Sequence, residues 1–96
     1  MPQITLRIPT PLRGFTGGAS DVAVELDDGE ATVGGALRAL GAKHPDVTGR
    51  ILTDDGALRT FVNVFAGDEA VRDLDERVAD GAVLHIIPAV AGGTAR

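Results

Sequence analysis

Two short runs near the amino terminus alternate strictly between apolar and polar residues, and this pattern restricts the fold more than any other feature of the chain. Successive side chains of a strand point to opposite faces, so each run predicts a strand with one buried and one open face. The segment between the runs is rich in proline and glycine and predicts a loop or wide turn, so we expect an antiparallel hairpin. The buried positions are Ile4, Leu6 and Ile8 in residues 3–8, and Val22, Val24 and Leu26 in residues 21–26.

The apolar spacing then becomes helical. Thr32 is placed to act as an N-cap, and Pro45 disfavours helical backbone at His44, so we predict a helix over residues 33–43. A glycine pair in its first turn weakens it. Residues 47–52 are expected to be irregular or to form a single turn. The apolar positions of the helix are Val33, Ala36, Leu37 and Leu40, and those of the following segment are Ile51 and Leu52.

Three further strands are predicted in the second half of the chain, over residues 61–66, 69–72 and 83–88. In the first of these, Asn63 decides the orientation, because a buried amide needs hydrogen-bond partners. The open face should therefore carry Phe61, Asn63 and Phe65 there, and His85 and Ile87 in the last strand. Residues 73–79 are expected to be irregular, with Leu74 and Val78 as anchors.

The element order is strand, strand, helix, strand, short strand, strand in 96 residues, which is the size of one domain. A hairpin, a crossover helix and a later pair of strands can form one mixed sheet. We therefore predict an α+β fold of the ubiquitin-like β-grasp type, in which a mixed four- to five-stranded sheet packs on one helix.

Composition narrows the functional classes. The net charge is −5 with three aromatic residues, which disfavours nucleic-acid binding and leaves a basic protein partner or simple solubility as explanations. Cysteine is absent, and no apolar run is long enough to span a bilayer. His44 and His85 show no metal-ligand spacing, and Ser20 is the only serine, so neither a metal site nor a catalytic triad is predicted. We expect a cytoplasmic protein that binds no membrane.

The last strand and tail resemble the carboxyl terminus of the MoaD/ThiS family of ubiquitin-like sulfur carriers, with greatest similarity to the CysO-type carriers of actinobacterial cysteine biosynthesis. The resemblance extends over nearly the whole chain up to Gly93. It is carried by Ile86-Ile87-Pro88-Ala89-Val90-Ala91-Gly92-Gly93, and by residues 8–13, 16–18, 61–65 and 68–72.

The resemblance implies a mechanism. A MoeB/ThiF-type adenylyltransferase would use ATP to activate the carboxylate of Gly93, a sulfur donor would convert it to a thiocarboxylate, and a sulfur-accepting synthase would take the sulfur. The carrier would bind no cofactor and would not itself be an enzyme. Cysteine, molybdopterin, thiamine and sulfur-containing natural products stay open as destinations. Two other functions also stay open: a ubiquitin-like protein modifier, and a binding module with a vestigial tail.

The Gly-Gly tail is chemically suited to this role. Glycine has no Cβ, so Gly92 and Gly93 permit close approach in a narrow channel. The dipeptide occurs three times in the chain, so its place after the last strand matters more than its presence. Thr94-Ala95-Arg96 follow it, and a carboxylate held in a peptide bond cannot be adenylated. We therefore predict a β-grasp domain over residues 1–91, a flexible tail over residues 92–96, and a processing protease of the zinc-dependent, deubiquitinase-like type.

The predicted open face suggests where the activating enzyme docks. Phe65, Asn63, Ile87 and His85 should form an exposed apolar patch beside the tail. Arg72 and Arg7 are expected at its rim. The alternative is that residues 47–58 cover part of this face.

Overall fold

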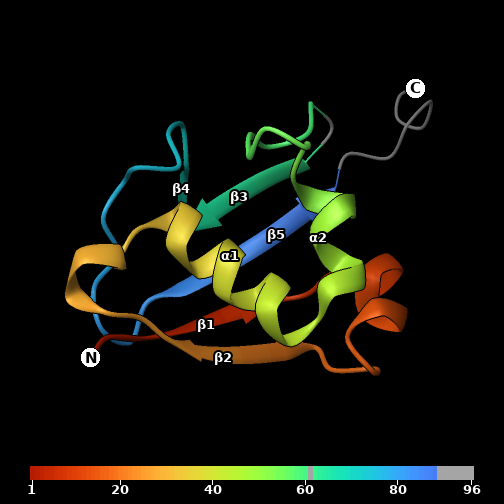
Figure 1. The fold of residues 1–96 in the computed structure, drawn as a ribbon, viewed down its shortest axis with the longest axis horizontal. Coiled ribbons are helices and arrows are strands. Elements are labelled where there is room, and N and C mark those ends of the chain that lie inside the picture. The colour runs from red at the N-terminus through yellow and green to blue at the C-terminus, as the bar shows by residue number, and fades with distance from the viewer. Residues whose placement is uncertain (61, 89–96) are drawn as a thin grey trace.

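The computed structural model describes residues 1–60 and 62–88, and it contains five strands, two α-helices and two short 3-10 helices (Figure 1). In chain order these are β1 (Gln3–Arg7), η1 (Thr10–Phe15), β2 (Asp21–Glu25), η2 (Asp28–Glu30), α1 (Val33–Lys43), α2 (Pro45–Ile51), β3 (Val62–Ala66), β4 (Glu69–Ala70) and β5 (Val83–Pro88). Phe61 and residues 89–96 lie outside the described residues. Neither helix in the described part of the chain is long and apolar enough to cross a membrane.

The strands form one mixed sheet in the order β2-β1-β5-β3-β4. β1 pairs antiparallel with β2 and parallel with β5, and β5 pairs antiparallel with β3. The predicted hairpin and the predicted mixed sheet are therefore confirmed. β5, the strand that leads into the Gly-Gly tail, lies between β1 and β3 in the interior of the sheet.

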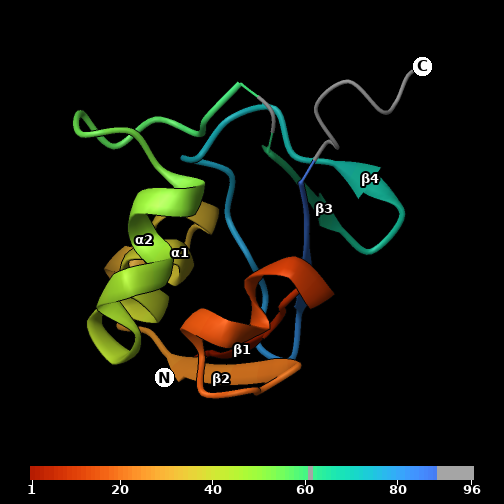
Figure 2. The ribbon, with the colours of Figure 1, turned by 90° about the vertical axis from the view of Figure 1, so that its right-hand side faces the viewer.

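Both α-helices lie on one side of the sheet (Figure 2), which leaves the other side open. The core between the two layers consists of residues that the apolar patterns placed inward, together with Val47, which they did not single out. From the sheet these are Ile4, Leu6, Val22, Val24, Val62, Val64, Leu84 and Ile86, and from the helices Val33, Ala36, Leu37, Leu40, Val47 and Ile51, none more than 5% exposed.

The second helix corrects the sequence prediction of an irregular segment and of a single helix. Pro45 occupies the first turn of α2, where its missing N–H needs no partner, so the residue that ends α1 also begins α2. Val47 and Ile51 lie four residues apart and are both buried, as one face of a helix requires. Residues 10–15 are likewise a 3-10 helix within the segment predicted to be a loop.

The first backbone N–H groups of α1 all donate hydrogen bonds to acceptors elsewhere in the chain. The hydroxyl of Thr32 accepts a hydrogen bond from the backbone N–H of Gly35 at 3.0 Å, which confirms the predicted cap. The N–H groups of Val33 and Gly34 donate to the carbonyls of Glu76 and Leu74, at 2.9 and 2.8 Å. The loop before β5 therefore supplies the acceptors that a helix start otherwise lacks.

Candidate functional site

The open face of the sheet brings four of the predicted docking residues together. Asn63 of β3 is the register partner of Ile87 in β5, and Phe65 is the partner of His85. Asn63 and Ile87 are exposed, whereas Phe65 and His85 are half-buried. The predicted orientation of both strands is confirmed, because their alternate residues, such as Val64 and Ile86, are in the core.

A shallow depression of about 360 Å³ lies on this face and is lined by Phe65, Gly67, Asp68, His85 and Ile87. Ile87 is 46% exposed, and among the described residues only Met1 is a comparably exposed large apolar side chain. An exposed apolar residue beside a depression is typical of a protein docking surface. The sequence analysis did not single out Gly67 and Asp68, which lie between two predicted strands, as docking residues. The signal that could have placed them here is that this turn directly follows Phe65 in a tight hairpin.

Two arginines were predicted at the rim of this face. Arg7 is the register partner of His85 across β1 and β5, so it flanks the depression as expected. Its guanidinium lies 3.5 Å from the carboxylate of Asp21, and both side chains are more than half exposed. Such a pair contributes under about 1 kcal/mol to stability. Its importance is that it places a charged pair beside an apolar patch.

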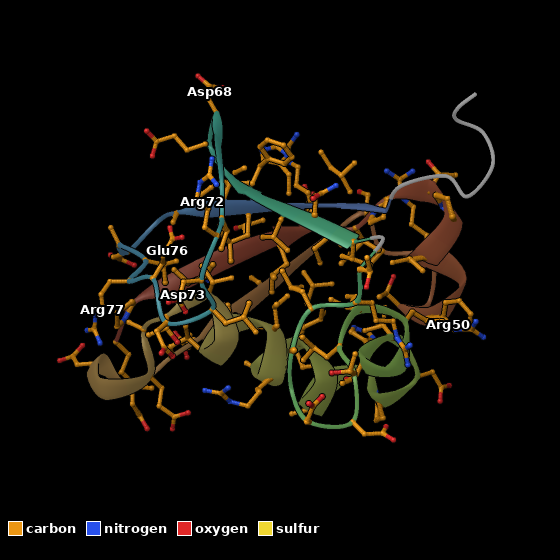
Figure 3. The ribbon with its side chains drawn as sticks, turned by 90° about the horizontal axis from the view of Figure 1, so that it is seen from above. Arg50, Asp68, Arg72, Asp73, Glu76 and Arg77 are labelled. Carbon is orange, nitrogen blue, oxygen red and sulfur yellow. The ribbon has the colours of Figure 1, made fainter. Side chains whose placement is uncertain are left out.

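Arg72 is not part of this depression. It lies on the loop after β4, near Glu76 (Figure 3). Together with Glu69, Ala70 and Glu76 it lines a separate depression. Its backbone N–H donates to the carboxylate of Glu76 at 2.8 Å, which fixes the loop and leaves the side chain exposed. The patch we name the docking face is therefore Asn63, Phe65, His85 and Ile87, with Arg7 and Asp68 at its rim.

Residues 47–58, which were the alternative occupant of this face, do not lie on it. α2 packs on the helical side of the sheet (Figure 2), and Leu58 packs against the buried core. In the turn between them, the Thr53 hydroxyl donates to the carboxylate of Asp55, and together with the backbone N–H of Asp55 it lowers the pKa of that carboxyl. These contacts organise a surface turn. The described residues contain no group of three or more His, Cys, Asp or Glu that could hold a metal ion.

The position of β5 limits where the tail can deliver its carboxyl group. Pro88 is the last described residue and is the register partner of Val62 at the start of β3. Gly92 and Gly93 lie outside the described residues, so the predicted division into domain and tail stays a prediction. Five residues lead from Pro88 to Gly93, and even a fully extended chain of that length spans at most about 18 Å. Ile87 directly precedes Pro88, so only this short segment separates the docking face from the carboxyl group of Gly93.

Comparison with known proteins agrees with this geometry. The ThiS family model matches residues 6–93. The sulfur carrier protein CysO of Mycobacterium tuberculosis is 38% identical over 95 residues, covering 94% of this chain and 98% of the relative. The crystal structure of small archaeal modifier protein 1 from Haloferax volcanii superimposes with a TM-score of 0.83 at 37% identity, covering 95% of this chain and 99% of that one.

A third relative was solved as a complex. The structure of the BexX/CysO complex of Amycolatopsis orientalis contains a chain that is 39% identical to this one, with a TM-score of 0.79, covering 94% of this chain and 99% of that chain. The mixed five-stranded sheet is therefore the β-grasp fold that was predicted. Because the family model covers most of the sequence, the chain belongs to the ThiS family of small ubiquitin-like sulfur carriers, which are carriers rather than enzymes.

Proposed function

We propose that this chain carries sulfur as a thiocarboxylate on Gly93, after residues 94–96 have been removed. The observation that carries the proposal is that the family match runs through residue 93 and ends there, at the second glycine of the tail. The similarity to the CysO sulfur carrier extends over 94% of the chain. The three residues beyond Gly93 block its carboxyl group as a peptide bond, so cleavage comes first.

Activation then proceeds in two displacements on the partner enzyme. An oxygen of the Gly93 carboxylate attacks the α-phosphate of ATP, and pyrophosphate leaves. Sulfide attacks the acyl carbon of this adenylate and AMP leaves, which yields the thiocarboxylate. A persulfide donor would first form an acyl disulfide, which a second thiol cleaves to the thiocarboxylate as a disulfide forms. The carrier contributes an unhindered electrophile, because neither Gly92 nor Gly93 has a side chain beside the reacting carbon. In this proposal a MoeB/ThiF-type enzyme binds the ATP and the carrier does not. Because that enzyme uses cytoplasmic ATP, we propose that the carrier acts in the cytoplasm.

Cysteine biosynthesis is the destination we propose, because the similarity to CysO carriers spans the whole domain. The acceptor would be a cysteine-synthase-type enzyme that holds an activated serine. The BexX/CysO complex of A. orientalis supports the expectation that the carrier acts while bound to a partner protein. Carriage of sulfur to molybdopterin, thiamine or another natural product is the alternative within the same chemistry.

The docking face is the surface we assign to the activating enzyme. Replacing Ile87 with Asp puts a charge into the apolar patch, and we expect kcat/KM for ATP–pyrophosphate exchange to fall at least about tenfold for a chain ending at Gly93. Ala42→Asp adds the same charge at an exposed position of α1 on the helical side and serves as the matched control. Equal loss in both variants, or no loss in either, would remove the docking face from the proposal.

A second function, protein modification, is favoured by one specific observation. Small archaeal modifier protein 1 of H. volcanii is 43% identical over 76 residues, covering 79% of this chain and 85% of the relative. A modifier would use the same activated Gly93 to form an isopeptide bond with a lysine of another protein.

Protein recovered from the native host separates these functions and tests the processing step. We expect intact-mass spectrometry to find a chain that ends at Gly93, because only that form has the carboxylate that activation needs. Immunoblots of the lysate should show one band for a dedicated carrier and a ladder of larger conjugates for a modifier. A thiocarboxylate-competent form that still contains Arg96 contradicts the processing step.

A further inference from the structure

The outer edge of β2 is a second exposed surface, separate from the docking face. β2 is the first strand in the sheet order, and among residues 1–60 and 62–88 no strand pairs with its outer side. The opposite edge is shorter, because β4 has only two residues. An edge strand presents unpaired backbone groups to which another chain can add as a further strand.

The register shows which groups point outward. The N–H of Ile8 donates to the carbonyl of Ser20 at 2.7 Å, and the N–H of Leu26 donates to the carbonyl of Pro2 at 2.9 Å. In an antiparallel pair, bonded and non-bonded residues alternate, so the even-numbered residues of this strand bond to β1. The N–H and C=O groups of Asp21, Ala23 and Glu25 therefore face the outer edge.

One contact within the chain supports this assignment. The ammonium group of Lys43, the last residue of α1, donates to the carbonyl of Ala23 at 2.8 Å. Lys43 is the only lysine of the chain; the other eight basic residues are arginines. A cationic donor thus already occupies the centre of the edge, and both Lys43 and Ala23 are exposed. Any added strand has to displace that ammonium group.

The charged residues around the edge indicate the chemical class of the partner. Asp21 and Glu25 flank Ala23 on the open face. The charged residues that line a groove beside the end of β2 are Glu25, Asp27, Glu30 and Arg38, so acidic groups outnumber basic ones there. A second copy pairing antiparallel about Ala23 would place Asp21 opposite Glu25, and like charges directly opposite each other destabilise a strand pair. We propose that the outer edge of β2 is a docking surface for an extended, basic segment of a partner protein.

The pairing geometry fixes the spacing of the partner's charges. Side chains on one face of a strand recur every second residue, so residues opposite Asp21 and Glu25 lie four apart in the partner segment. The residue between them faces the small side chain of Ala23, and its two neighbours face the helical side. Asp21 also pairs with Arg7 at 3.5 Å, so Glu25 is the more available of the two carboxylates. The acidic charge of the chain, −5, favours the same class of partner.

The test is an NMR titration of the full chain with the capped peptide SKVSVKS, whose lysines lie four apart, and with its twin SEVSVES. We expect saturable shifts at the amides of Asp21, Ala23 and Glu25 with the first peptide. The glutamate twin should bind at least about tenfold more weakly, because both cross-strand pairs become repulsive. Shifts centred instead on Phe65 and Ile87 would assign the peptide to the docking face and overturn the proposal.

Three variants isolate the edge. Lys43→Ala should tighten binding about three- to tenfold, since the competing hydrogen bond is lost, whereas Lys43→Arg keeps a donor and should bind as the wild type does. Ala23→Pro removes an outward N–H and leaves the ladder to β1 intact, so it should abolish binding without loss of the fold. Equal binding by Ala23→Pro and the wild type, or no saturable shift in either the wild type or Lys43→Ala, contradicts the proposal.

Discussion

A chain that ends at Gly93 is expected to exchange one carboxyl oxygen for sulfur when it is incubated with the activating enzyme, ATP and sulfide, and the chain that ends at Arg96 is expected to exchange none. The difference should be all or nothing, because the second chain has no carboxylate at Gly93 to attack ATP. Intact-mass spectrometry reads the exchange directly, and fragmentation of the terminal peptide assigns it to Gly93.

A chain that ends at Thr94 is the informative control. It offers a free carboxylate at nearly the same reach from Pro88, but a β-branched side chain lies beside the reacting carbon. We expect its adenylation to be slower by about 100-fold, since a small misplacement of the reacting group is enough for a loss of that size. A thiocarboxylate on Arg96, or equal rates for chains ending at Gly93 and Thr94, would show that the glycine terminus does not matter.

The parts of the fold that follow from local pattern were predicted correctly. The parity of the alternating runs placed Ile4 and Leu6 inward and Asn63 and Ile87 outward, because the strand period of two leaves only one orientation that buries the apolar set. The single amide of Asn63 was enough to orient β3. Thr32 as cap and the end of α1 before Pro45 also follow from local chemistry.

The errors in the predicted elements arise where one residue is compatible with two different local structures. Pro45 ends one helix and begins the next, and the seven-residue α2 has only two buried apolar residues inside it, too few to show a period. The same ambiguity applies to residues 10–15, where Pro11 and Gly14 suggest a loop but Pro11 is also suited to a first helical turn.

The candidate site shows a different limit. Phe65, His85 and Ile87 could be assigned to one face from their own strands, but their proximity to Arg7 depends on the parallel pairing of β1 with β5, which no local pattern encodes. The loop that carries Arg72 is held by hydrogen bonds from the backbone N–H groups of Arg72 and Asp73 to Glu76, and no local pattern encodes that contact. The Gly34-Gly35 pair, expected only to weaken α1, has a tertiary role in close packing.

Gly35→Ala is expected to lower stability more than Gly→Ala at any other glycine among the described residues. A Cβ at Gly35 would fall well inside van der Waals contact of the backbone carbonyl oxygen of Glu30, which cannot rotate away as a side chain can. We estimate about 3 kcal/mol of overpacking, offset by about 1 kcal/mol of better helix propensity, so unfolding should become about 2 kcal/mol easier. For a domain of this size the midpoint of thermal unfolding should fall by about 10 °C.

Two other glycines provide matched controls. At Gly49 in α2 an added Cβ would meet no heavy atom within 4 Å beyond its chain neighbours and the backbone of its own helix, among the described residues. Gly49→Ala should therefore raise the midpoint, because only the propensity gain remains. At Gly41 the added Cβ meets the hydroxyl oxygen of Thr48, a side-chain atom that can rotate, so Gly41→Ala should fall between the two. Differential scanning calorimetry gives this order directly. If Gly35→Ala proves as stable as Gly49→Ala, the turn at Glu30 can move, and the start of α1 is held by the carbonyls of Leu74 and Glu76 rather than by close packing against that turn.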